Sequence, residues 1–393
     1  MAGTITEIQL ATRPTSSIQF ALASVEDDAA IRRLLRDNPM RGEISVSLER
    51  EPNYFHDSHV AGEDNQTVLA VKSGRLVCMG HCTIGDRYIN GRVRRVGYLS
   101  GLRLDSSVQG RFDILRRGYQ FFRELQHDDP ADFYFTSITG DNIRSIRFLE
   151  RGLPGMPVYL PLGDFVTLLL PVPQKLQSLQ QRKEETIARL KSEGIEIISG
   201  SDVPGCQLTS FLNAQAGQFN LVARWNEENL LSLQRSGLTQ SDFQVLTGTG
   251  KVIACAALWD QRSFKQTVIR GYSRRLSFLK PILNLHAKMF DGPQLPAIGS
   301  TLAHGFLSPL ANSPGNERYL SGLIELSLLT AANRGLEFLT LGFSAGDPRL
   351  ALVRSKFRCR EYNSRLFQVL WTGENLKAPV LDGNLIFPEV ALL

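Results

Sequence analysis

No stretch of this sequence is long and apolar enough to cross a bilayer. No window reaches the roughly 18 consecutive apolar residues that a membrane-spanning helix needs. The opening residues, MAGTITEIQLATRP, do not combine a basic segment with an apolar one, as a secretory signal would. We therefore expect a cytoplasmic protein with no membrane partner.

Cysteine is scarce, with five residues scattered along the chain. An odd, dispersed set does not suit the disulfide framework of a secreted domain. Cys78, His81 and Cys82 form one cluster, and a metal site is one interpretation of it. The cluster falls in an apolar strand-like run, whose pleat would send the two cysteines to one face and the histidine to the other. No second ligand pair stands at zinc-site spacing, so we favour core packing and expect no metal.

Motifs of several common chemistries are also missing. The sequence has no Gly-x-Ser-x-Gly elbow, no Walker loop, no His-Glu-x-x-His and no dinucleotide glycine fingerprint. Aromatic and basic residues do not alternate along a strand as they do in RNA-binding sheets, and we expect no nucleic acid partner. The net charge of +5 is mild and suits an anionic ligand such as a nucleotide cofactor.

What the sequence does contain is two similar successions of elements. A chain of 393 residues favours two domains. Periodicity in the first part predicts strands at 17–23, 67–72, 76–84, 96–104, 132–138 and 165–172, and helices at 25–36, 111–126 and 142–151. The second part repeats this order with strands at 243–246, 252–259, 298–306, 337–343 and 365–371, and helices at 317–333 and 348–357.

The spacing of the elements supports a duplication. The long strand and the three elements after it begin at 96, 111, 132 and 142 in the first part and at 298, 317, 337 and 347 in the second, which gives offsets of 202, 206, 205 and 205. A polar segment with apolar residues at helical spacing separates the parts. We therefore predict a first domain at 1–172, a helical linker at 173–195 and a second domain at 196–393.

The second domain contains an insertion at 262–296. From Arg262 to Lys288 it holds seven Lys or Arg residues and no acid. A solvated basic face is one interpretation. The alternative is a docking surface for a phosphate-bearing ligand or for an acidic acyl carrier protein.

One segment of the first domain has the features of an anion-binding loop. Residues 102–111, Leu-Arg-Leu-Asp-Ser-Ser-Val-Gln-Gly-Arg, lead from a strand into a helix. Backbone N–H groups and the positive helix end converge in such a loop, and a glycine lets an anion approach closely. Further on, Asn142 and Ser145 open the next helix after a strand.

These two segments resemble the acyl-CoA-binding motifs of the GCN5-related N-acetyltransferase superfamily. The resemblance implies an α+β fold of two tandem domains, each a mixed, mostly antiparallel sheet flanked by helices. It implies that acyl-CoA or acetyl-CoA is the co-substrate, with the pyrophosphate at the loop and the pantetheine along the preceding strand. The cofactor-binding residues would then be Gly101, Leu102, Leu104, Gln109, Gly110, Arg111 and Asn142.

The implied reaction is transfer of an acyl group from acyl-CoA or a carrier-bound thioester to a small-molecule or peptide amine. Tyr98, His81 and Glu43 are candidate proton-transfer residues, and each is more often a packed or surface residue than a catalyst. In the second domain, Trp259, Asp260 and Ser344 are candidates for a substrate cleft, or parts of a degenerate scaffold.

Two other functions stay open. A non-catalytic tandem module that binds a ligand or partner is favoured by Phe112 and Ile114, which occupy later glycine positions of the loop motif, and by Leu149, which stands where many family members carry a tyrosine. Acyl or aminoacyl transfer like that of the tandem-domain ligases that build peptidoglycan bridges is suggested only by the presence of two such domains.

Overall fold

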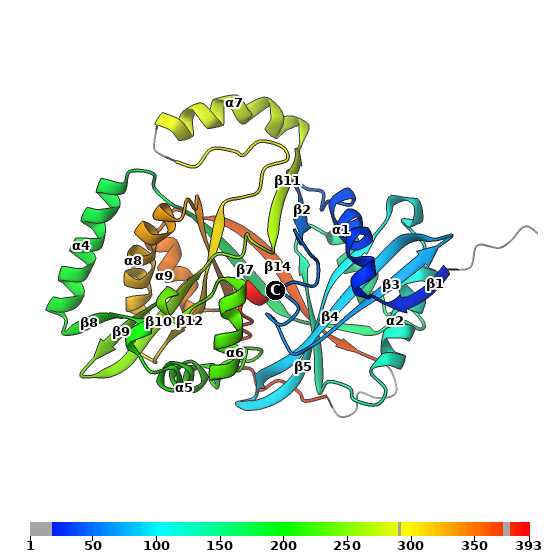
Figure 1. The fold of residues 1–393 in the computed structure, drawn as a ribbon, viewed down its shortest axis with the longest axis horizontal. Helices are drawn as coiled ribbons and strands as arrows, with labels where there is room; N and C mark the ends of the chain where they lie inside the picture. The colour runs from blue at the N-terminus through cyan, green and yellow to red at the C-terminus, as the bar shows by residue number, and fades with distance from the viewer. Residues whose placement is uncertain (1–17, 290–291, 372–377) are drawn as a thin grey trace, which may run out of the picture.

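A single twisted sheet of twelve strands runs through the molecule (Figure 1). The computed structural model describes residues 18–289, 292–371 and 378–393. The strands are, in spatial order, β1 (Ile18–Leu22), β3 (Asp64–Lys72), β4 (Arg75–Ile89), β5 (Arg92–Leu104), β6 (Phe133–Thr139), β14 (Arg360–Leu370), β7 (Val158–Pro171), β13 (Phe338–Ser344), β12 (His304–Asn312), β10 (Lys251–Trp259), β9 (Phe243–Gly248) and β8 (Ile195–Ser199). Two neighbouring pairs are parallel, β5 with β6 and β12 with β13, and the others are antiparallel. The predicted α+β class with mixed, mostly antiparallel sheets is confirmed.

The middle of the sheet joins the two parts of the chain. Strand β14, near the end of the sequence, lies between β6 and β7, and β7 in turn pairs with β13. Each part therefore supplies one strand to the centre of the other. We call residues 18–171 the first half and residues from 176 onward the second half. Strand β7 precedes the predicted domain boundaries at 172 and 195 in the sequence, and β14 follows them, yet the two strands pair. The boundaries therefore stay a prediction.

Helices cover both faces of the first half. Along β3 and β4 the side chains alternate, so Leu69 and Met79 pack under α1 (Asp28–Asp37), while Ala70 and Cys78 pack toward α2 (Phe112–Leu125). Helix α3 (Ile143–Glu150) joins α2 over the second face. Only apolar positions at helical spacing, such as Ile31, Leu34 and Leu35, are buried on α1.

The second half has the same two-faced arrangement. Helices α8 (Leu320–Asn333) and α9 (Pro348–Lys356) lie on one face, and α5 (Gly205–Ala216) and α6 (Glu227–Ser232) lie on the other. Helix α8 is apolar all round because α4 (Leu176–Ser192) covers the side that faces away from the sheet. The helix predicted for the linker segment is therefore present as α4.

A small second sheet connects the halves outside the main one. Strand β2 (Ile44–Glu49) of the first half pairs with β11 (Gln266–Tyr272) of the second, and helix α7 (Arg274–Met289) follows β11 (Figure 1). Both β11 and α7 fall within the predicted insertion at 262–296. The C-terminal segment, ending in the 3-10 turn Val390–Leu392, returns to the middle of the molecule.

One predicted strand was misplaced. The sequence predicted a strand at 298–306, whereas β12 covers His304–Asn312. Residues before it belong to the return from α7, where the Leu302 N–H bonds to the Thr267 carbonyl of β11. Pro309 lies within β12 at the irregularity of register with β10, where a missing N–H is tolerated. The N-terminal segment, for which we expect no secretory signal, lies outside the described residues, and so does residue 17, where the first predicted strand begins.

Candidate active site

The segment that would bind an acyl-CoA begins where β5 parts from β6. The two strands pair in parallel from Val96 with Phe133 to Leu99 with Thr136, and the Thr136 hydroxyl donates to the Leu99 carbonyl at 2.7 Å. Beyond that point both strands continue without pairing to each other. Backbone groups of residues 100–104 therefore have no strand partner on this edge in the described part of the chain.

A bulge accompanies the end of this pairing. The register of β5 against β4 shifts between the Met79–Arg103 pair and the His81–Ser100 pair. Gly101 lies in the bulge with φ of +65°, and a Cβ there would stand 3.3 Å from the Cβ of His81. Glycine is required for both reasons, because other residues are strained at positive φ and would crowd the histidine. Leu102 and Leu104 point to the α2 face and pack in an apolar cluster.

The loop after β5 is closed by its own hydrogen bonds. The Ser107 N–H donates to the Asp105 carboxylate at 2.9 Å, and the Arg111 and Phe112 N–H groups donate to carbonyls of the same loop at 3.1 Å. Asp105 is buried, and its pKa is lowered, first by the Ser107 hydroxyl and also by Arg75 at 2.7 Å. Gly110 has φ of +85° and open space where a Cβ would be. Because these N–H groups already donate within the loop, they are not free to bind a diphosphate.

Several side chains of the predicted loop site already contact neighbouring residues. Gln109 is exposed. The exposed Arg111 makes a two-bond ion pair with Asp113 at 2.7 and 2.8 Å. Phe112 stacks on Phe148 at 4.6 Å. Asn142 caps α3 by accepting a hydrogen bond from the Ser145 N–H at 3.2 Å. The predicted cofactor residues thus lie on the end of β5, on the loop between β5 and α2, and at the start of α3. Their role with acyl-CoA stays a prediction.

Two of the candidate proton-transfer residues share the α1 face of the sheet. Tyr98 is buried and stacks on Phe135 at 4.8 Å, and burial raises the pKa of its hydroxyl. His81 receives hydroxyl contacts on both ring nitrogens, from Thr67 at 2.8 Å and Thr83 at 2.9 Å. Burial lowers the pKa of His81 to about 4, so the imidazole is neutral at physiological pH. Glu43, in contrast, is exposed and lies before β2.

The three candidates from the second half do not come together as a cleft. Trp259 is fully buried, and its ring N–H donates to the Ser236 carbonyl at 2.7 Å. Asp260 is held by Arg262 at 2.7 Å, and the Ser344 hydroxyl donates to the Ile386 carbonyl at 2.8 Å. Each of these side chains has an internal structural partner, and their assignment to substrate stays a prediction.

The corresponding place in the second half is narrow, with a cavity of about 10 Å³ beside Leu310, Asn312 and Arg349. Strands β12 and β13 pair from His304 to Phe306 and then separate, as β5 and β6 do. Beside the separation lies Arg349, which is 3% exposed and paired with Asp347 at 2.7 Å. Its guanidinium lies 4.4 Å from the Phe387 ring and 5.0 Å from the Phe219 ring. The Arg349 side chain therefore occupies part of the space beside the separation of β12 and β13.

Between the halves, the structure gathers charged groups that sequence reasoning missed. Arg50 of the first half pairs with Asp57. Lys265 of the second half donates to the Leu393 backbone oxygen at 2.6 Å, and burial lowers its pKa to about 7. The positive charge of Arg50 also disfavours the protonated form of Lys265, so the two cations, one from each half, act on each other. No spacing in the sequence could reveal this group, because its members are far apart along the chain.

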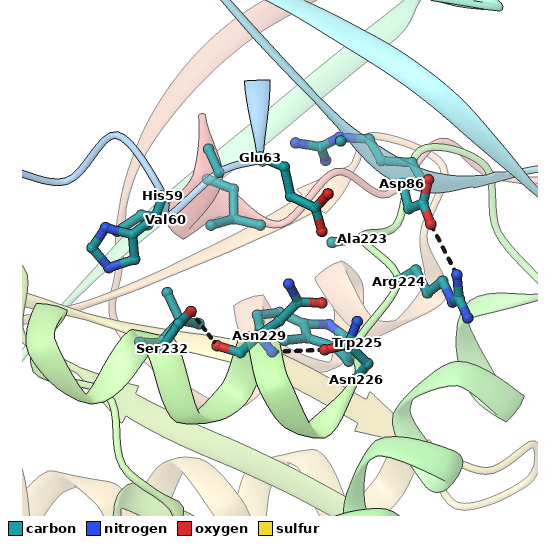
Figure 2. A pocket seen from close by; sticks show the side chains of 16 residues that line it. His59, Val60, Glu63, Asp86, Ala223, Arg224, Trp225, Asn226, Asn229 and Ser232 are labelled. Carbon is teal, nitrogen blue, oxygen red and sulfur yellow. Dashed lines mark hydrogen bonds and ion pairs between the residues drawn. The ribbon is translucent and has the colours of Figure 1, made fainter. Parts of the chain in front are cut away.

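A separate cavity of about 70 Å³ also lies between the halves. It is lined by the 59–63 segment, β4 and α6, and Figure 2 shows Glu63 and Trp225 within it. Asp86 and Arg224 form an ion pair at 2.9 Å in its wall. None of the residues predicted for the site lines this cavity. It is therefore distinct from the β5 loop.

Comparisons with solved structures define the fold. The chain superposes on the N-myristoyltransferase of Saccharomyces cerevisiae with bound myristoyl-CoA, with a TM-score of 0.56 and 10% identity, over 92% of this chain and 85% of that one. It also superposes on a GCN5-related N-acetyltransferase from Sphaerobacter thermophilus, with a TM-score of 0.51 and 14% identity, over 94% and 100%. This chain therefore has the fold of the GCN5-related N-acetyltransferase superfamily, in tandem form, as predicted.

Sequence comparisons add no closer relationship. No family model matches the chain, and no curated protein matches it. Within the described residues, no helix is long and apolar enough to cross a membrane. The predicted cytoplasmic location stays a prediction.

Proposed function

We propose that the protein is an N-acyltransferase that takes its acyl group from acyl-CoA and binds it in the first half, along residues 100–104. The observation that carries this proposal is the end of β5–β6 pairing beside the bulge at Gly101. Unpaired backbone groups there can bond to the amide groups of a pantetheine arm as an added strand would. Two structures of similar fold are an N-myristoyltransferase with bound myristoyl-CoA and a GCN5-related N-acetyltransferase, which supports this class of donor.

The proposed reaction joins an amine to the thioester carbonyl. The amine nitrogen attacks the carbonyl carbon, the C–S bond breaks, and an amide forms. The amine gives up one proton, and the leaving thiolate takes up one. A backbone N–H near Gly101 would polarise the carbonyl, and binding both reactants at one place supplies much of the rate.

The α1 face offers groups for the proton steps. The raised pKa of Tyr98 keeps its hydroxyl protonated, so it can hydrogen-bond to the leaving sulfur, although the same shift makes it a weak proton donor. The imidazole of His81 is neutral, but its lowered pKa of about 4 makes it a weak base, and both ring nitrogens already contact threonine hydroxyls. A small-molecule or peptide amine is the proposed acceptor. An acyl carrier protein at residues 262–296 stays a prediction.

A matched pair of glycines tests the donor site. Gly110 in the first half and Gly315 in the corresponding loop of the second half have φ of +85° and +80°, and both have open space around a built Cβ. Alanine should cost each about 1 kcal/mol of stability through positive φ alone. We expect Gly110→Ala to weaken acyl-CoA binding about tenfold, because the added methyl group would occupy space that the bound pyrophosphate needs, and Gly315→Ala to leave it unchanged. Calorimetric titration with acetyl-CoA and with myristoyl-CoA measures both.

The second candidate function is a binding module without catalysis. It is favoured by the self-bonded loop and by Phe112, whose ring stacks on Phe148 where the family motif has a glycine. Absence of heat with every thioester, in a protein that unfolds cooperatively, would favour this function and reject the acyltransferase.

A further inference from the structure

Helix α7 stands at the edge of the molecule with one side held by its own return segment (Figure 1). Lys280 donates to the Pro296 carbonyl at 2.5 Å and lies 4.5 Å from the Tyr272 ring. Asn284 exchanges two hydrogen bonds with the backbone of Leu295, at 2.7 and 3.3 Å. These contacts define the inner side of the helix.

The outer side carries large apolar residues. Phe278, Ile282, Leu285 and Met289 are 81%, 62%, 62% and 72% exposed. At 100° per residue they fall within an arc of about 60°, centred about 150° from the direction of Lys280 and Asn284. We call these four residues the apolar stripe. A continuous exposed stripe of this kind marks an interaction surface.

Basic residues flank the apolar stripe. Arg274 and Arg275 are exposed and lie about 50° to either side of its centre. Lys288 is exposed near the other end of the helix. The helix contains no acid. Arginines in the first turn oppose the helix dipole, so their presence is not explained by the stability of the helix itself.

We propose that α7 docks on the surface of an anionic lipid bilayer, with the apolar stripe inserted at the headgroup boundary and the basic residues on lipid phosphates and carboxylates. A helix with an apolar stripe between cations is the arrangement that lies in a membrane interface. A lipid surface adapts to the convex stripe, whereas a folded partner needs a matching groove. A second copy placed by a two-fold axis would bring like charges together. This proposal departs from the sequence-based expectation of no membrane partner, and it concerns binding to the surface and not crossing.

Vesicle flotation with the full chain tests the proposal. The vesicles are phosphatidylcholine alone, and phosphatidylcholine mixed with phosphatidylserine. We expect binding to the mixed vesicles that is about tenfold stronger than to phosphatidylcholine alone and that weakens with salt. The triple variant Phe278→Ser, Ile282→Ser, Leu285→Ser should lose at least about tenfold in binding. The matched control is Leu231→Ser on α6, which changes a leucine that is 58% exposed.

A second pair of variants separates charge from apolar insertion. Arg274→Gln with Arg275→Gln should weaken binding to the mixed vesicles, and the exposed pair Lys191→Gln with Lys251→Gln should not. Equal binding to both vesicle types, or full binding by the triple variant, overturns the proposal. So does a stripe-dependent dimer, or stripe-dependent capture of an acyl carrier protein, in the absence of vesicle binding. The outcome does not depend on acyl transfer, so failure of the proposed function leaves it intact.

Discussion

Arg103 brings a positive charge into a partly buried position beside the unpaired end of β5. Burial lowers its pKa, and its guanidinium donates to the Leu102 carbonyl at 2.8 Å. Within the described residues, the group that favours its charge is the Tyr362 hydroxyl and not a carboxylate. Removing a guanidinium from water costs free energy unless an anion pairs with it. Under the proposed function, that anion is a phosphate of the acyl-CoA.

Replacing this charge gives a residue-scale prediction. We expect Arg103→Gln to weaken acyl-CoA binding by about tenfold, because a charge-assisted hydrogen bond to phosphate is lost. The control is Arg92→Gln, an exposed arginine at the start of the same strand. Titration with an acyl-pantetheine, which has no phosphate, should show equal affinity for the wild type and the variant. A loss of affinity for that analogue as well would mean that Arg103 acts only by holding the strand.

At the scale of elements, the strand–loop–helix order around the candidate site could be predicted, but the contacts of its side chains could not. The sequence predicted that residues 102–111 lead from a strand into a helix, as they do in β5 and α2. That Asp105 closes the loop by bonding Ser107 is a matter of local rotamers that no periodicity reveals. The strand predicted at 298–306 was misplaced for another reason: the apolar pattern of the sequence continues across the start of β12 at His304.

The C-terminal segment offers an element-scale prediction about pH. Glu389 lies buried against β12, where its carboxylate accepts a hydrogen bond from Ser308 at 2.6 Å. Burial raises its pKa to about 7. Because the folded-state pKa is above the unfolded one, the stability that Glu389 contributes is present below about pH 4.5 and is lost as the pH rises through 7. We expect this effect to lower the free energy of unfolding by about 3 kcal/mol over that pH range.

Glu389→Gln measures that effect. The amide keeps an acceptor for Ser308 but cannot ionise. Urea unfolding should give a variant similar to wild type at pH 5 and more stable by about 2 kcal/mol at pH 8. A variant that is less stable at pH 8 would show that the ionised carboxylate is stabilised by Arg87 and Arg349, whose charges oppose the effect of burial.

For the whole molecule, the exchange of β7 and β14 couples the two halves. Each strand lies at the centre of the sheet and pairs on both sides, so neither half has a complete sheet without the other. We expect the full chain to unfold in one cooperative transition by calorimetry. The separate fragments 1–172 and 173–393 should each fail to fold, and co-expression should restore a soluble complex. A stable, cooperatively unfolding fragment 1–172 would contradict this and would support an independent first domain.

The sequence by itself determined the order of elements, the tandem pattern and the position of the β5–α2 loop, because periodicity, turn residues and motif spacing are local properties. Only the tertiary structure decided which strands meet at the centre of the sheet, and which charged groups gather between the halves. The exchange of β7 with β14 depends on pairing energies summed over residues nearly 200 positions apart. The meeting of Arg50 with Lys265 likewise follows from how the halves pack, and that information is not local in the chain.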